Sequence, residues 1–197
     1  YEDKYEYVAP EITLNKNLFA SENLGVLDLQ TNLKVHNYDT NKLTNFLVND
    51  LSWSSKDLVH KSGIKSKFLS NFKNINHETK NVDQYKKDST SELYGAIGYQ
   101  SEVKFQKNRG KNQHYLKPKL FARYAPGSMR KEDTGSRLDP VEAFNMDRLN
   151  HINNFETGLT AAVGFDFKTK QKNNGKQLDF SVAQIISEKE NKKMSSK

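Results

Sequence analysis

The residue types that most often carry enzyme chemistry are few and scattered in this chain. Its 197 residues include no cysteine, which excludes disulfides, thiolate metal sites and cysteine nucleophiles. A Gly-Lys pair in "NRGKNQ" (108–113) lacks the G-x-x-x-x-G-K-[ST] frame of a phosphate-binding loop. The histidines share no metal-ligand spacing; they are His36, His60, His77, His114 and His151. His36 with Asp50 and Ser52 resembles a hydrolase set, but strand alternation produces such sets by chance. We therefore expect no catalysis, no cofactor and no metal.

Positive charge on one face of an extended segment is the more informative feature. In "LKPKLFARYAPG" (116–127) apolar and charged residues alternate with a period of two, the pattern of a strand with one apolar and one charged face. One parity holds Leu116, Pro118, Leu120, Ala122 and Tyr124, and the other holds Lys117, Lys119, Phe121 and Arg123. Pro118 is expected at the start of this strand, because proline cannot donate to a strand ladder.

Similar strands, separated by turn signals, fill most of the chain. Each spans about ten residues, which is the length that a tilted strand needs to cross the hydrocarbon of a bilayer. The remaining expected strands are 7–14, 27–36, 43–53, 64–72, 91–105, 157–167 and 178–186. The sequence thus predicts an all-β fold, an antiparallel up-and-down meander of about eight strands.

The lengths of the connections suggest two unlike rims. In a meander, alternate connections lie at the same rim of the sheet. The two long loops expected at about 73–90 and 126–155 are the fourth and sixth connections, so they share one rim. Short turns opposite long loops are typical of outer-membrane barrels. In the second loop, "DPVEAF" predicts a short helix capped by Asp139, with Phe144, Met146 and Leu149 as its apolar side. This loop either packs on itself or folds as a lid over or into a pore.

Composition bears on whether the apolar faces meet lipid or a protein core. Only 35% of the residues are hydrophobic, 28% are charged and 11% are aromatic. The aromatic content argues against disorder. A soluble β-sandwich or lipocalin-like barrel must fill a shared interior, whereas a lipid-facing barrel needs no second apolar layer, so the low hydrophobicity favours the membrane barrel. The net charge of +7 names no partner, and because lysines are spread over both rims and all loops we expect no nucleic-acid binding.

The order of several segments resembles a known family. "HYLKPKLFARYAPG", "DRLNHINNFETGLTAAVGFDF" and "LDFSVAQII" are similar to the C-terminal barrel of the lipopolysaccharide-assembly outer-membrane proteins of the LptD (OstA) family, and "NYDTNK" followed by "NDLSW" fits the middle of that barrel. The resemblance covers most of the chain and is better from 113 to 187. Residues 1–197 are accordingly expected to be a partial transmembrane β-barrel domain, an arc of a larger barrel without its signal peptide.

The resemblance implies a non-enzymatic translocon that inserts lipopolysaccharide into the outer leaflet of the outer membrane of a Gram-negative bacterium. It also implies a plug lipoprotein (LptE-like) and periplasmic bridge proteins as partners. Lys117, Lys119 and Arg123 would then face the lumen as speculative contacts for the phosphates of lipopolysaccharide. The simpler alternative is that they pair with acidic residues of neighbouring strands. The alternative function is a porin-type or other uptake channel, with 126–155 as its constriction loop.

Overall fold

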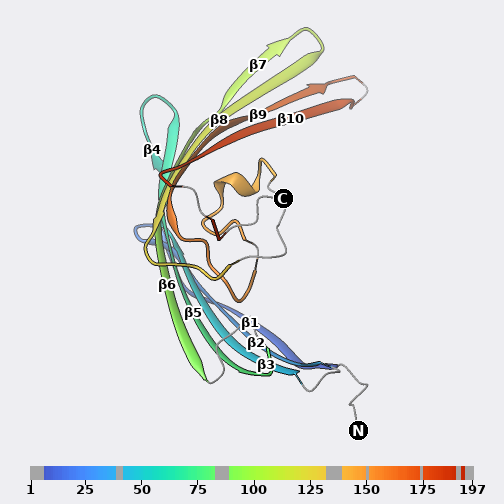
Figure 1. The fold of residues 1–197 in the computed structure, drawn as a ribbon. Coiled ribbons are helices and arrows are strands. Elements are labelled where there is room, and N and C mark those ends of the chain that lie inside the picture. The colour runs from blue at the N-terminus through green and yellow to red at the C-terminus, as the bar shows by residue number, and fades with distance from the viewer. Residues whose placement is uncertain are drawn as a thin grey trace.

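The chain forms one curved antiparallel sheet. The computed structural model describes residues 7–38, 42–82, 89–131, 139–149, 151–173, 175–189 and 192–193. Within these ranges ten strands follow the order β1-β2-β3-β5-β6-β8-β9-β10, with β4 added to β5 and β7 to β8. The strands are β1 (Tyr7–Ser21), β2 (Gly25–Tyr38), β3 (Lys42–Ser54), β4 (Leu58–Val59), β5 (Ile64–Lys80), β6 (Thr90–Val103), β7 (Phe105–Arg109), β8 (Asn112–Ala125), β9 (Gly158–Gln171) and β10 (Gln177–Ser187). The predicted up-and-down meander is confirmed, as a sheet that curves but does not close (Figure 1).

Two expected connections begin with residues that belong to strands. β1 continues to Ser21, seven residues past the expected strand end at residue 14, so the first connection is 22–24. β5 continues to Lys80 and stays in register with β3 throughout, so the long loop expected at 73–90 is wrong in its first half. This half was hidden because one face of it carries Asn74, Asn76 and Glu78 where the pattern required apolar residues. The contrast between the rims therefore depends on the connection 126–157.

Pro118 lies inside β8 rather than at its start, and the sheet is interrupted beside it. β8 pairs with β6 as far as Lys119 opposite Glu102, and with β7 from Leu116 opposite Phe105 onward. Lys117 and Pro118 have no paired residue on that side, although Pro118 pairs with Phe165 on the other. Because proline has no N–H to donate, the break between β6 and β7 falls where a ladder bond cannot form.

The register brings the predicted apolar positions together on the convex face. Leu33 lies opposite Leu47, and Leu120 lies opposite Val163. Large apolar side chains at this parity are 40–65% exposed; they include Leu47, Phe68, Phe72, Leu93, Ile97, Leu120, Tyr124, Val163, Phe180, Val182 and Ile186. A shallow apolar groove of about 430 Å³ lies on this face, between Trp53, Phe68 and Tyr124. The alternation predicted for 116–127 is thus a convex apolar face and a concave charged one.

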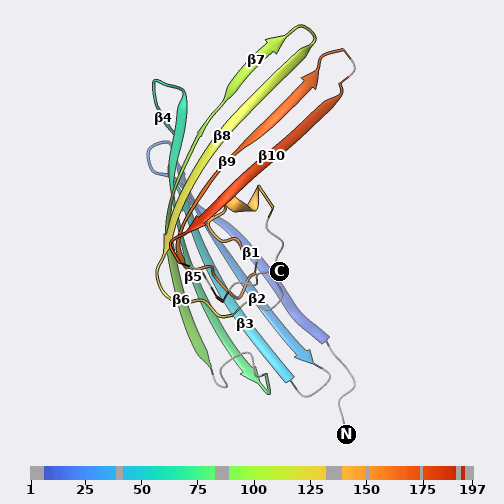
Figure 2. The same cartoon turned by 45° about the horizontal axis from the view of Figure 1, so that its top comes forward.

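The described residues of the connection 126–157 (126–131, 139–149 and 151–157) pack against the concave face (Figures 1 and 2). Hereafter we call them the inner loop. Two apolar clusters lie between this loop and the sheet: one joins Phe155 to Phe46, Val48, Ile75, Tyr94, Ala96 and Ala125, and the other joins Ala143 and Phe144 to Phe121 and Ala162. Met146 packs against both clusters. The described part of the loop therefore packs against the concave side of the sheet rather than on itself alone.

The helix predicted from Asp139 is a single 3-10 turn, Glu142–Phe144, whose N-cap is Val141 rather than Asp139. Asp139 Oδ1 still accepts hydrogen bonds from the backbone N–H of Val141 (2.7 Å) and Glu142 (2.9 Å), just before the turn. Phe144 and Leu149 are buried, as expected for the apolar side. Across the part of the chain that the structure describes, no helix has the length and apolar character needed to cross a membrane.

Candidate functional site

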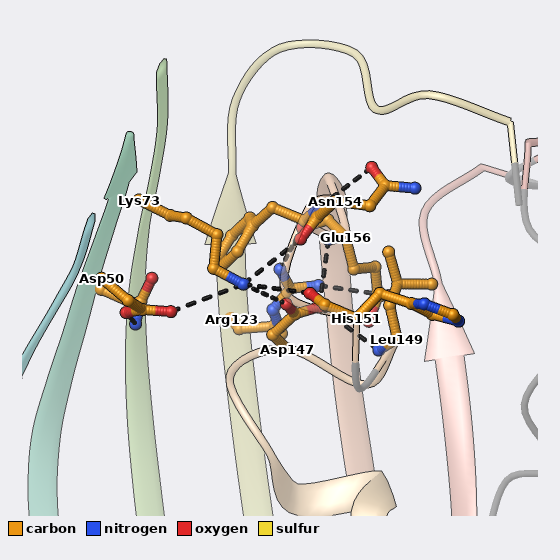
Figure 3. A network of polar contacts seen from close by, with 10 residues as sticks. Asp50, Lys73, Arg123, Asp147, Leu149, His151, Asn154 and Glu156 are labelled. Atoms are coloured by element: carbon orange, nitrogen blue, oxygen red, sulfur yellow. Dashed lines mark hydrogen bonds and ion pairs between the residues drawn. The ribbon is translucent and has the colours of Figure 1, made fainter. Parts of the chain in front are cut away.

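Lys73 joins the sheet to the inner loop through a buried network (Figure 3). It projects from β5 and is 5% exposed. Its Nζ forms ion pairs with Asp147 of the loop (3.1 Å) and Asp50 of β3 (3.4 Å). It also donates to the carbonyl oxygens of His151 (3.4 Å) and Asn154 (3.2 Å). An ammonium group with two carboxylates and two carbonyls has the partners that a buried cation requires.

Arg123 forms the second junction, from β8. Its side chain is fully buried, its guanidinium lies 3.1 Å from Glu156 Oε1, and it donates to the Glu156 carbonyl oxygen. Arg148 holds the same carboxylate with two hydrogen bonds, of which Nε to Oε2 is 2.7 Å. Glu156 is therefore a buried acceptor shared by one arginine of the sheet and one of the loop.

The ring of Phe155 lies against both junctions. Lys73 Nζ is 5.3 Å and Arg123 Cζ is 5.9 Å from the ring centroid, which is within the range of cation–π attraction. A third junction forms where Arg130 of the loop pairs with Glu92 of β6, which also accepts a hydrogen bond from Tyr94 (3.1 Å). The inner loop is thus fixed to the sheet by ion pairs. The sheet supplies the cation at Lys73 and Arg123, which both lie near the Phe155 ring, and it supplies the carboxylate at Glu92.

The three predicted contact residues all lie on the concave face, and each is paired with a carboxylate. Lys119 Nζ is 2.9 Å and Lys117 Nζ is 3.4 Å from Asp166 of β9, and Lys117 is 3.7 Å from Glu102. Lys119 also lies 4.5 Å from the centroid of the Phe144 ring. Arg123 belongs to the separate cluster around Glu156. These pairs favour the alternative in which the cations neutralise neighbouring carboxylates, since a phosphate would have to displace those carboxylates first.

The structure does not bring together the set of His36, Asp50 and Ser52 considered from the sequence. His36 pairs with Thr44, while Asp50 pairs with Gln30, which lies six residues before His36 on β2. At about 3.4 Å per residue this separates the histidine from the aspartate by roughly 20 Å. Among the described residues, no three histidine or acidic side chains are grouped so that they could hold a metal ion.

The sequence pattern missed Lys73, Asp147, Arg148 and Glu156. Lys73 was assigned to a loop, so its place on the concave parity was not recognised. The other three lie in the inner loop, whose contacts with the sheet span long separations: Lys73 and Asp147 are 74 residues apart. The sequence does show charged residues in this loop, at Asp147–Arg148 and beside Phe155 at Glu156. Nothing local in the sequence shows which strand these side chains contact.

Comparison with known proteins does not indicate a function for the chain. No family model matches the chain, and no curated protein matches it significantly.

Proposed function

We propose that this chain is an arc of an outer-membrane β-barrel that takes part in inserting lipopolysaccharide into the outer leaflet. The observation that carries the membrane part of this proposal is the two-faced sheet. Lipopolysaccharide, the plug lipoprotein and the periplasmic bridge enter through the resemblance to the LptD family, which is supported by the order of the segments from 113 to 187.

The convex face has the character of a surface in contact with lipid. Its large apolar side chains form a continuous set across β2, β3, β5, β6, β8, β9 and β10, and many are half exposed. In water, monomeric proteins seldom expose apolar patches beyond a few hundred Å². A transmembrane barrel requires this band, because strands of such barrels alternate apolar-out with polar-in.

The concave face has the character of a wet lumen. Lysines and carboxylates alternate on it, and outside the inner loop many of them are partly exposed: Lys34 pairs with Glu11 and Lys168 pairs with Asp179, with side chains 42–57% exposed. Exposed ion pairs of this kind contribute only about 0–1 kcal/mol each to stability, so their main effect is to keep the concave wall hydrated.

A second candidate function is uptake of small solutes through a porin-type channel. The observation that favours it is the inner loop, which is fixed on the concave wall and would narrow a closed lumen at that level (Figure 2). The two functions differ in what the lumen contacts, a lipid-anchored glycan or a free solute.

Photo-crosslinking in living cells tests the proposal. A photoreactive amino acid placed at Lys34 on the concave face of the full-length chain should yield adducts with lipopolysaccharide, whereas the same group at Glu188, beyond the end of β10, serves as the control. If Lys34 yields no lipopolysaccharide adduct while the purified protein conducts small solutes in a planar bilayer, the channel function replaces the translocon.

A further inference from the structure

The concave face carries a second feature away from the inner loop, a patch of uncovered amide, hydroxyl and carboxylate groups on β1, β2, β3 and β5. We call it the polar plate; it consists of Asn15, Asn17, Asp28, Gln30, Ser52 and Asn71. The register sets these side chains in two adjacent rows, with Asn15 opposite Gln30 in one and Asn17 opposite Asp28 in the next. Ser52 and Asn71 continue the second row, and Asp50 continues the first toward Lys73.

Part of the plate is held in place by its own hydrogen bonds. Asn17 donates to Asp28 (2.8 Å), and Asn71 donates to Asp50 (2.6 Å), whose other oxygen faces Lys73. Asp50 is thereby fixed to the buried network that anchors the inner loop. The plate has a rigid border on that side.

Other groups of the plate are left for a ligand. Asn15, Gln30 and Ser52 are exposed and make no side-chain hydrogen bond to any residue in the described ranges. The hollow above the plate has a volume of about 480 Å³, within the 300–1,000 Å³ typical of small-molecule sites. Strands spaced about 4.8 Å apart, and rows about 6.8 Å apart, present these groups as a grid.

The composition of the plate selects a neutral, hydroxyl-rich ligand. Amide side chains donate and accept at once, as sugar hydroxyls do, and a hydroxyl such as that of Ser52 does the same. Lys16 also lines the hollow, but it lies between Asn15 and Asn17 on β1 and pairs with Leu29, which places it on the apolar parity of the sheet rather than in the plate. The adjacent Lys73 is buried among its own partners. Asp28 and Asp50 disfavour an anion. We infer that the polar plate binds neutral carbohydrate, so that the concave wall recognises sugar hydroxyls here rather than phosphates at Lys117, Lys119 and Arg123.

This inference deepens the proposed function, since it rests on the concave face lining an open lumen. The saccharide would come either from a lipid-anchored glycan or from a free solute. Two probes separate these sources: maltoheptaose as a free neutral glycan, and the dephosphorylated core oligosaccharide of lipopolysaccharide. Binding of either probe supports the plate, and their relative affinities show which source it prefers.

Titration calorimetry on the full-length protein in detergent tests the plate. The double variant Asn15→Ala, Gln30→Ala removes two hydrogen-bonding amides, each contributing about 1 kcal/mol, so the Kd for the probe that binds should rise roughly 30-fold. The matched control is Gln184→Ala, an exposed glutamine on the convex face of β10, which should leave the Kd unchanged. Excess inorganic phosphate should not compete.

Three results would overturn the inference: no binding of either glycan to the unaltered protein, equal Kd values for the double variant and the control, or competition by phosphate. A failure of lipopolysaccharide crosslinking at Lys34 together with binding of maltoheptaose would remove the translocon and leave the plate as a solute site. The two proposals can therefore fail separately.

Discussion

Removing the charge of Glu156 should release the inner loop from the sheet. The carboxylate is 1% exposed and faces two buried guanidinium groups, with Arg123 at 3.1 Å and Arg148 at 2.7 Å. At an effective dielectric constant of 20, a unit charge pair at 3.1 Å is worth about 5 kcal/mol before desolvation. Breaking a buried pair from one side costs about 3–5 kcal/mol, because the partner charge stays buried without compensation. Glu156→Gln should therefore weaken docking of the loop by about 3 kcal/mol.

A cysteine beneath the loop reports this change. Ala125 ends β8 in the apolar cluster with Phe155 and is 1% exposed, and the chain has no cysteine of its own. When labelling requires local opening, its rate follows the open fraction. With Ala125→Cys as the reporter, a loss of about 3 kcal/mol should speed labelling by a water-soluble thiol reagent about 100-fold, since each 1.4 kcal/mol is a factor of ten.

The control is Glu142→Gln, which makes the same substitution in the same loop at a carboxylate that forms no ion pair with any of the residues the structure describes. It should leave the labelling rate within twofold of the parent. Equal rates for Glu156→Gln and Glu142→Gln would refute the view that buried charge pairs fix the inner loop.

Three further predictions follow from the same contacts. A Cβ at Gly98 would lie 2.6 Å from Met146 Sδ, which implies an overpacking cost of about 1–3 kcal/mol. Gly98→Ala should therefore raise the labelling rate of the Ala125→Cys reporter about tenfold. The control Gly95→Ala, where a Cβ would meet nothing within 4 Å, should leave that rate unchanged. Leu120→Arg should lower the free energy of unfolding in a bilayer by about 2–4 kcal/mol in a urea titration, while Leu120→Met should change it by less than about 1.5 kcal/mol. Lys73→Gln leaves two partly buried carboxylates, Asp50 and Asp147, without their buried cation and should increase protease cleavage of the inner loop; unchanged cleavage would assign docking to the apolar clusters instead.

The sequence was a good guide wherever one face of a strand was apolar along its whole length. β2, β9 and β10 keep the predicted parity, and the interior charges of 116–127 lie where alternation placed them. Segment 43–53 carries apolar residues on both of its parities, so alternation alone does not show which face is outside. The structure supplies the reason: Phe46 and Val48 pack under the inner loop, while Leu47 lies on the convex face.

Prediction failed where the outer face turns polar or where contacts are remote in sequence. The second half of β5 carries asparagine and glutamate outward, so its period of two was lost although its backbone pairing with β3 is continuous. Pro118 was placed at a strand start because the gap between β6 and β7 that tolerates it was invisible in the sequence. The buried network depends on which loop carboxylate meets which strand cation. Local periodicity holds no information on that choice.

The central claim is that the apolar face of this sheet contacts lipid and the concave face contacts water. Single cysteines at Leu33 and Lys34 on β2, and at Val163 and Lys168 on β9, would be tested in membranes with a lipid-confined thiol probe and with a membrane-impermeant one. The parent side chains of Lys34 and Lys168 are 42% and 46% exposed, so both positions are open to the aqueous reagent. The account predicts that Leu33 and Val163 react with the lipid probe alone and that Lys34 and Lys168 react with the aqueous one alone. Protection of Leu33 and Val163 from both probes, in a protein that stays soluble without detergent, would contradict it.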